Sequence, residues 1–259
     1  RLIKNKIYNI ELSAGPYEKD IVDYVLKKKK KIPKINFLIH NYFPPTKIPF
    51  VLNLSSGDKI IQKKSIKLAI NAIRLSRKLG SKFYGFHAGF LIDPIIKSLG
   101  KKIVFNNNPL KRSTARKNFI KSVKILSKHA KMNNINLLIE NNVLTKKNYK
   151  LFGYNPLLCV ENKEINLIMK QMPSNVNFLL DVAHLNVSSK TLGFNKIKFL
   201  KECNKWIKAY HLSENDGLSD SNKFVSKKSW FWKHLKKDVY SFTLETRSNN
   251  LNDIKKQIK

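Results

Sequence analysis

The sequence predicts an α/β protein whose parallel strands form a (β/α)8 barrel, and it predicts that the first strand of that barrel is missing from this chain. Three observations support this prediction. Apolar, strand-like runs alternate with helical patterns along the whole sequence. Several of these runs end on a histidine or a carboxylate, and a closed ring of strands brings such distant residues together. Seven such strands can be counted, whereas the closed barrel has eight.

The first half of the sequence predicts three strand–helix units. Strand 7–13 leads to a helix near 18–30, and strand 35–40 follows. A loop with three prolines separates that strand from a long amphipathic helix, 59–79, after which Gly80 suits the left-handed position that commonly ends a helix. Strand 82–87 leads through a long loop to Ser113 or Thr114, either of which can cap a helix that runs to residue 132.

The second half repeats the pattern. Strand 135–140 precedes a long loop and a helix near 163–171, and strand 176–181 precedes a helix near 195–206. Strand 207–211 is followed by a loop and a short helix near 229–236, strand 240–245 is the last, and residues 251–259 belong to a final helix. Because no segment has the composition of a linker, we expect residues 1–259 to form a single domain.

The strand count implies an open seam. The residues before position 7 are too few for a further strand and its helix, so we expect the missing first strand upstream of Arg1. The first and last strands of this chain would then present unpaired backbone edges to one another.

Composition limits the classes of function. Hydrophobic residues make up 42% of the 259 residues, which suffices for a folded core. No stretch approaches the roughly 18 apolar residues of a membrane span, and no signal peptide is recognisable. Cys159 and Cys203 lie far apart without metal-binding spacing, so we interpret them as free thiols in a reducing compartment. We therefore expect a cytoplasmic protein with no membrane partner.

The net charge of +34 favours polyanionic partners such as nucleic acid or phosphorylated sugars. However, lysine, asparagine and isoleucine are abundant together, as an A/T-rich coding sequence produces without selection for binding. The lysines at 27–31 also lie near the end of a predicted helix, where cations suit the helix dipole. We therefore keep nucleic acid as a secondary partner, behind a small molecule, and the sequence indicates no oligomeric state.

Histidines and carboxylates at the strand ends predict a metal centre. A single histidine after an apolar run usually forms a structural hydrogen bond, but here four lie among three strand-terminal carboxylates, which are costly to bury unpaired. Mixed imidazole and carboxylate ligands suit zinc or manganese first, then cobalt or iron, better than calcium or magnesium. The candidates are His40, His87, Glu140, Asp181, His184, His211 and Glu245.

These motifs resemble the xylose-isomerase-like TIM barrel superfamily, which includes sugar isomerases, sugar epimerases and endonuclease IV. The pattern is IEN at Glu140, DVAH at Asp181 and His184, YHLSEND at His211 and LET at Glu245. In the sugar epimerases four such residues hold one metal, so the resemblance implies Glu140, Asp181, His211 and Glu245 as ligands. It also implies that Glu140 and Glu245 act as the acid/base pair.

The first half resembles endonuclease IV in particular. His40 followed by NYF, and His87 in FHAG, match two further zinc-binding histidines of that family. Its third zinc needs the equivalent of His184 and an Asp-x-His in the loop after His211, where this sequence has Asp220-Ser221-Asn222. Asparagine is a poor zinc ligand beside imidazole. The glycine-rich stretch that follows in that family and its DNA-inserting loop are also lacking, which disfavours DNA cleavage.

Our first hypothesis is therefore a metal-dependent sugar or sugar-phosphate isomerase/epimerase that transfers a proton through an enediolate. One of Glu140 and Glu245 would remove the proton and the other would return it, while His184 would bind a substrate oxygen. His40 and His87 would complete a second metal site or line the pocket. The alternative hypothesis is a zinc-dependent apurinic-site DNA endonuclease.

Overall fold

The structure is a computed structural model that describes residues 2–98, 103–105, 108–248 and 250–258. Arg1 and Lys259, the two ends of the predicted domain, lie outside the described residues. Part of the long loop predicted after residue 87 lies outside them as well.

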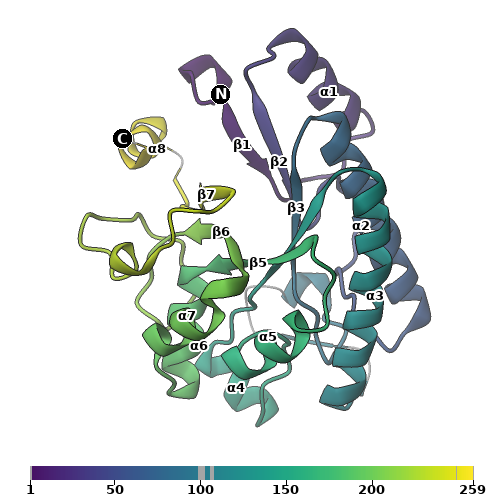
Figure 1. The fold of residues 1–259 in the computed structure, drawn as a ribbon, viewed down its shortest axis with the longest axis vertical. Coiled ribbons are helices and arrows are strands. Elements are labelled where there is room, and N and C mark those ends of the chain that lie inside the picture. Colours follow the sequence, from purple (N-terminus) through teal and green to yellow (C-terminus); the bar gives the residue numbers. More distant parts are fainter. Residues whose placement is uncertain (1, 99–102, 106–107, 249, 259) are drawn as a thin grey trace.

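Within the described residues, seven parallel strands follow one another around the sheet in sequence order (Figure 1). This confirms the predicted fold, a (β/α)8 barrel that lacks one strand. In the described part of the chain, β1 and β7 form the two edges and have no main-chain pairing with each other. The strands are β1 (Asn9–Leu12), β2 (Asn36–His40), β3 (Phe83–His87), β4 (Asn136–Glu140), β5 (Val176–Asp181), β6 (Ile207–Leu212) and β7 (Ser241–Leu244).

Helices cover the outer face of the sheet (Figure 1). They are α1 (Ile21–Lys31), α2 (Lys59–Lys78), α3 (Arg112–Met132), α4 (Lys146–Phe152), α5 (Asn162–Met169), α6 (Val182–Leu192), α7 (Lys196–Cys203) and α8 (Leu251–Ile258). Short 3-10 turns lie at Ile3–Asn5, Ile96–Ser98, Asn204–Trp206 and Trp232–His234. The main apolar core fills the space between these helices and the outward side chains of the strands.

Two helices were not predicted from the sequence. Helix α4 lies in the segment expected to be a long loop; the Thr145 side chain accepts a hydrogen bond from the Asn148 N–H at its start, and Gly153 ends it with φ +71°. Helix α6 follows β5 directly, where no helix was expected before residue 195. In contrast, the helix predicted near 229–236 is only a 3-10 turn, Trp232–His234.

The alternation of side chains along the strands sets the position of the candidate site. Phe83, Leu138, Leu179 and Ala209, from four adjacent strands, form a separate small apolar cluster. Because strand side chains repeat every second residue, the positions two residues further along face the same interior. Those positions are Gly85, Glu140, Asp181 and His211. A polar layer therefore lies above an apolar layer, at the C-terminal ends of the strands.

The two cysteines, Cys159 and Cys203, are free, as predicted, and both are buried. None of the helices in the described residues is both long enough and apolar enough to cross a bilayer.

Candidate metal centre

The strand register brings the predicted residues to one level of the barrel. His87 of β3 is paired with Glu140 of β4, and Asp181 of β5 is paired with His211 of β6. His40 of β2 is paired with Gly85, whose hydrogen side chain leaves room for the imidazole: a Cβ at Gly85 would lie 3.0 Å from His40 Cδ2. Side chains from several strands can therefore converge on the barrel axis.

Four of the predicted residues, Glu140, Asp181, His211 and Glu245, form one cluster in which a ligand atom from each lies within 4.8 Å of the others. His211 Nδ1 lies 3.3 Å from Glu140 Oε1 and 3.0 Å from Glu245 Oε2. Glu140 and Asp181 are fully buried, whereas the Glu245 side chain, one residue beyond β7, keeps 39% exposure. The cluster is therefore closed below and open at the Glu245 side.

Each member of this cluster has at least one buried atom without a hydrogen bond among the described residues. The atoms are Glu140 Oε1, Asp181 Oδ2, both ring nitrogens of His211 and Glu245 Oε2, and His211 Nδ1 lies within ion-pair distance of the Glu140 and Glu245 oxygens. Buried oxygens and nitrogens without a hydrogen bond are rare and costly, and converging carboxylate and imidazole atoms are donors that suit a divalent cation. The residues present therefore fit such a cation.

A second cluster contains His40, His87 and Glu140, again with ligand atoms within 4.8 Å. His40 Nε2 is hydrogen-bonded to Glu140 Oε2 at 2.7 Å, and His87 Nδ1 lies 3.4 Å from the same oxygen. Glu140 thus faces the first cluster with Oε1 and the second with Oε2. A carboxylate shared in this way can bridge two cations.

His184 lies beside the clusters but is a member of neither. The backbone N–H of His184 donates to Asp181 Oδ1 at 2.7 Å, so Asp181 caps α6 and fixes the start of the helix that carries His184. Its Nδ1 lies 2.8 Å from the backbone oxygen of Asn141, and its Nε2 lies 3.5 Å from Asp220 Oδ2. Asp220 therefore does approach His184.

Asn222 is used differently. Its side-chain amide donates a hydrogen bond to the backbone oxygen of Glu245 at 2.9 Å. Among the described residues, no group of three or more metal-type ligand atoms includes His184. The two clusters around Glu140 are thus candidate cation positions, whereas His184 and Asp220 by themselves supply too few ligand atoms for another.

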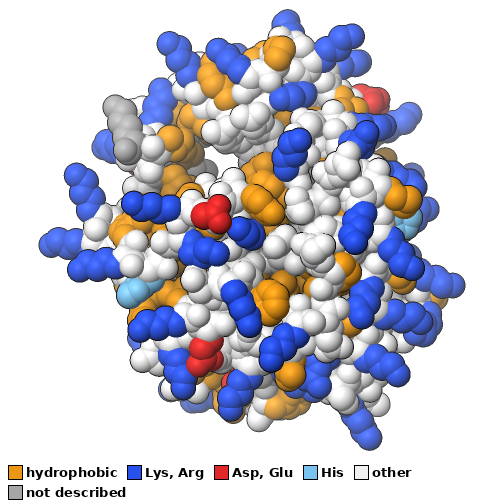
Figure 2. All heavy atoms as spheres, in the orientation of Figure 1, with side chains coloured by type: hydrophobic (Ala, Val, Ile, Leu, Met, Phe, Trp, Pro, Cys, Tyr) orange, Lys and Arg blue, Asp and Glu red, His pale blue; other side chains and the backbone are white. Residues whose placement is uncertain are grey.

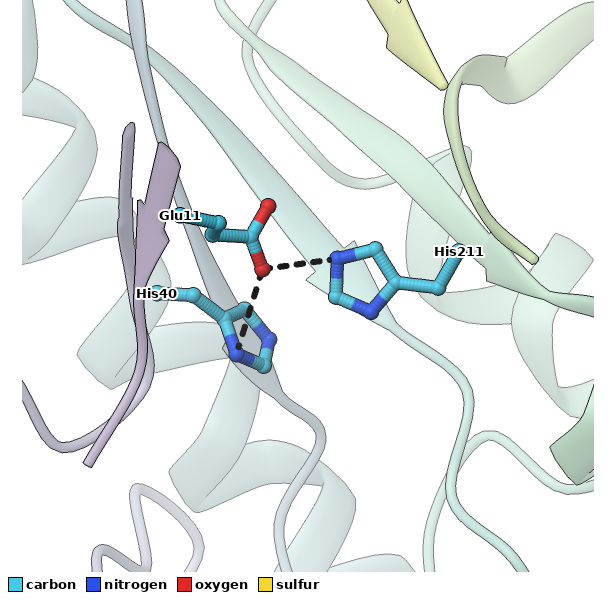
Figure 3. Close-up of side chains that lie close together, drawn as sticks. All are labelled: Glu11, His40 and His211. Atoms are coloured by element: carbon cyan, nitrogen blue, oxygen red, sulfur yellow. Dashed lines mark ion pairs between the residues drawn. The ribbon is translucent and has the colours of Figure 1, made fainter. Parts of the chain in front are cut away.

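Glu11 of β1 was not predicted as a site residue, yet it lies against two of the predicted histidines (Figure 3). Its Oε1 is 2.9 Å from His211 Nε2 and 3.8 Å from His40 Nδ1, and the three residues form a further cluster of ligand atoms within 4.8 Å. The available signal was the one carboxylate in the predicted strand 7–13.

The electrostatics of the carboxylates differ. Burial raises the pKa of Glu140, but the surrounding imidazoles, His87 foremost, outweigh burial and hold that pKa well below its usual value. Burial also opposes ionisation of Glu245, yet His211 lowers its pKa to about 2. Asp181 is the opposite case, since burial raises its pKa well above the usual value, with Glu245 and Glu140 adding to the rise.

The pKa values of the histidines are also shifted in opposite directions. Burial lowers the pKa of His211, but Glu11 and Glu140 outweigh it and raise that pKa well above normal. Asp181 and Asp220 do the same for His184 against its burial. For His87, burial prevails and lowers the pKa to about 4. His87 is therefore a neutral imidazole with a lone pair available for a cation.

The fold and the site together define a parallel barrel with a polar, histidine- and carboxylate-rich centre at the C-terminal ends of its strands. The family model of the xylose isomerase-like TIM barrel matches residues 9–243, and the chain belongs to this family. No curated protein sequence matches the chain.

Solved structures with the same fold include proteins of sugar chemistry. A D-tagatose 3-epimerase-like protein is 16% identical with a TM-score of 0.70, over 97% of this chain and 85% of the other. D-psicose 3-epimerase from Clostridium cellulolyticum, with D-tagatose, is 15% identical with a TM-score of 0.62, over 98% and 81%. A Thermus thermophilus protein soaked with zinc chloride is 14% identical with a TM-score of 0.65, over 99% and 91%. Such identities show the shared fold alone.

Proposed function

We propose that this protein is a metal-dependent sugar or sugar-phosphate isomerase/epimerase. The observation that carries the proposal is the set of four converging, buried ligand atoms on Glu140, Asp181, His211 and Glu245 within the described residues. Family membership and the sugar epimerases among the proteins of the same fold support the class of reaction.

The chemistry follows from the state of each side chain. A bound divalent cation supplies Lewis-acid polarisation of a substrate carbonyl. Glu140 and Glu245 have lowered pKa values, so both are carboxylates that can accept a proton from the carbon next to that carbonyl. One of them removes the proton, becoming a carboxylic acid as the enediolate forms. That acid can return the proton to the neighbouring carbon, or the other carboxyl group, after taking a proton from solvent, can protonate the opposite face.

His184 is suited to hold a substrate oxygen. With Nδ1 against the backbone oxygen of Asn141, its Nε2 faces Asp181 and Asp220. Its raised pKa keeps a proton on Nε2, which can donate to a hydroxyl or carbonyl oxygen of the substrate.

The basic surface supports an anionic substrate without indicating a nucleic-acid groove. Figure 2 shows Lys and Arg side chains spread over the whole of this face, with no concentration along one stripe. A hollow opens in the upper half of the same face, in the region that β1 and β7 occupy in Figure 1. A net charge of +34 would attract a sugar phosphate to such an opening by long-range steering.

The test is exchange of the substrate proton with solvent. The purified protein, loaded with zinc or manganese, is incubated in D2O with a panel of ketoses and ketose phosphates, and deuterium entering next to the carbonyl is measured by NMR. We expect exchange with at least one member. Glu245→Gln should slow exchange by about 10²–10⁴-fold, the usual contribution of an acid/base group.

Glu202→Gln is the matched control, because the Glu202 side chain has the same 39% exposure but lies on the outer helix α7. It should leave exchange unchanged. A wild-type protein that loads metal yet exchanges no proton of any ketose would refute the proposal.

A second candidate function, cleavage of apurinic-site DNA, is favoured by two observations. His40, His87 and Glu140 form the second cluster, and Asp220 approaches His184. Against it, the Asn222 amide is committed to the backbone of Glu245. Nicking of a duplex with one abasic site, compared with the intact duplex and with added chelator, tests this function. Efficient metal-dependent nicking without ketose exchange would reverse our choice.

A further inference from the structure

We propose that Glu11 is a positioning residue that orients the imidazoles of His211 and His40 toward the metal centre. This inference rests on the proposed function, since it concerns the metal centre on which that function depends. Glu11 belongs to β1, the edge strand farthest in the sheet from β6 and β7, which supply His211 and Glu245.

Each imidazole lies between two carboxylates. His211 has Nε2 2.9 Å from Glu11 Oε1 and Nδ1 3.3 Å from Glu140 Oε1. His40 has Nδ1 3.8 Å from Glu11 Oε1 and Nε2 2.7 Å from Glu140 Oε2. In both rings one nitrogen faces Glu11 and the other faces the candidate cation positions around Glu140.

This arrangement selects the ligand atom. A neutral imidazole carries one N–H and one lone pair, and the partner of the N–H decides which nitrogen can bind a cation. A carboxylate behind a metal-binding histidine is the common partner, and it fixes both the tautomer and the ring orientation. Glu11 therefore favours the proton on Nε2 of His211, which leaves Nδ1 as the lone pair in the cluster with Glu140, Asp181 and Glu245.

For His40 the effect of Glu11 is indirect. The hydroxyl of Ser13 lies 3.1 Å from His40 Nδ1 and makes the direct hydrogen bond, while Glu11 at 3.8 Å contributes its charge. The same Glu11 oxygen therefore biases the rings that belong to two different clusters, although it acts at closer range on His211.

Glu11 itself is held in place. Thr243 of β7 donates its hydroxyl to Glu11 Oε2 at 3.0 Å, which leaves Oε1 to face the imidazoles. The Glu11 side chain is only 13% exposed, so few other positions are open to it.

Glu11, His40 and His211 also lie close enough to share a cation, which would give Glu11 the different role of a ligand. His211 would then bind through Nε2 instead of Nδ1. Ser13 already occupies the Nδ1 side of His40, and Thr243 holds one Glu11 oxygen. These two hydrogen bonds favour the positioning role.

The experiment compares Glu11→Ala and Glu11→Gln with Glu18→Gln in the full chain. Glu18 is exposed, so its variant controls for the loss of one negative charge. Zinc affinity is measured by competition with a chromophoric chelator, and metal content by elemental analysis. The ring nitrogen of His211 that keeps its proton in the zinc-loaded protein is read from two-bond ¹H–¹⁵N NMR correlations.

We expect Glu11→Ala to weaken zinc binding about 10–100-fold, the usual effect of losing a partner behind a ligand. It should also shift His211 away from the Nε2–H tautomer. Glu11→Gln has nearly the same shape and its amide oxygen still accepts an N–H, so it should restore most of the affinity and the tautomer, and Glu18→Gln should match the wild type.

The outcomes separate this inference from the proposed function. If the wild type binds no metal, both are overturned. If the wild type binds metal and Glu11→Ala binds it with unchanged affinity and tautomer, only the role of Glu11 is overturned. If Glu11→Ala loses one whole equivalent of metal and the remaining affinity is unchanged, Glu11 is itself a ligand and the positioning role is wrong.

Discussion

Removing the metal should lower the thermal stability of the protein by an amount that follows from the affinity of the centre. Glu140, Asp181, His211 and Glu245 bring carboxylate and imidazole atoms within 4.8 Å of one another only in the folded chain, so a cation held by them binds the native state and not the unfolded one. A ligand of this kind at about 1,000 times its Kd stabilises the native state by about 4.1 kcal/mol.

The corresponding change in Tm is large enough to measure. For a chain of this size, 1 kcal/mol shifts Tm by about 2–4 °C, so saturating zinc or manganese should raise Tm by about 8–16 °C above the value in chelator. The assay is thermal unfolding followed by circular dichroism, with the metal concentration varied.

Two aspartate variants provide the comparison. Asp181 caps α6 and Asp58 caps α2, and asparagine caps a helix as well as aspartate does. Asp181→Asn should therefore keep its cap but remove the metal-dependent rise in Tm, while Asp58→Asn should keep both. Equal melting of the wild type in metal and in chelator, or a full rise in Asp181→Asn, would refute the reasoning.

Two further predictions concern pH and a glycine. The raised pKa values of His211 and Asp181 mean that both hold protons that a cation must displace. Zinc affinity should therefore rise with pH, about tenfold per unit for each proton released. Calorimetry in buffers of different ionisation enthalpy counts those protons, and an affinity that is flat between about pH 6 and 8 would contradict the prediction. Gly85→Ala would put a Cβ 3.0 Å from the His40 ring and should lower the amount of metal bound per chain, measured by elemental analysis. Gly15→Ala is the control, because nothing lies within 4 Å of its added Cβ. Equal metal content in the two variants would contradict this prediction.

The sequence was sufficient for the strands and for most of the centre because buried strands and their terminal polar residues are local patterns. Each apolar run that ends on a histidine or carboxylate can be recognised from six or seven consecutive residues. Parallel strands then place these end residues at the same edge of the sheet. His40, His87, Glu140, Asp181 and His211 all lie at strand ends for this reason. Their role as ligands stays a prediction.

The two helices that were not predicted, α4 and α6, lack the amphipathic periodicity from which a helix is recognised in a sequence. Helix α6 is buried nearly all round, from Val182 to Ser189, so it has no polar face and no helical periodicity. Helix α4 is only seven residues long, and lysines occupy three of its positions. In both cases the usable signals were the caps, Asp181 and Thr145 before the helices and Gly193 and Gly153 after them.

Glu11 was missed because its importance depends on the curvature of the sheet. The sequence places it in the first strand, but only the barrel brings that strand opposite β6, so that Glu11 and His211, 200 positions apart, come within 2.9 Å. The alternation of residues along a strand predicts the face on which a side chain lies. It does not predict which residue of a distant strand that side chain contacts across the barrel.

The open seam between β1 and β7 gives the centre a mechanical role. In the described residues no main-chain ladder joins these two edges, yet Glu11 on one side contacts Thr243 and His211 on the other. These side-chain contacts join the two edges across the seam, so separation of the edges would also distort the centre. We therefore expect metal binding to slow amide hydrogen exchange in both β1 and β7.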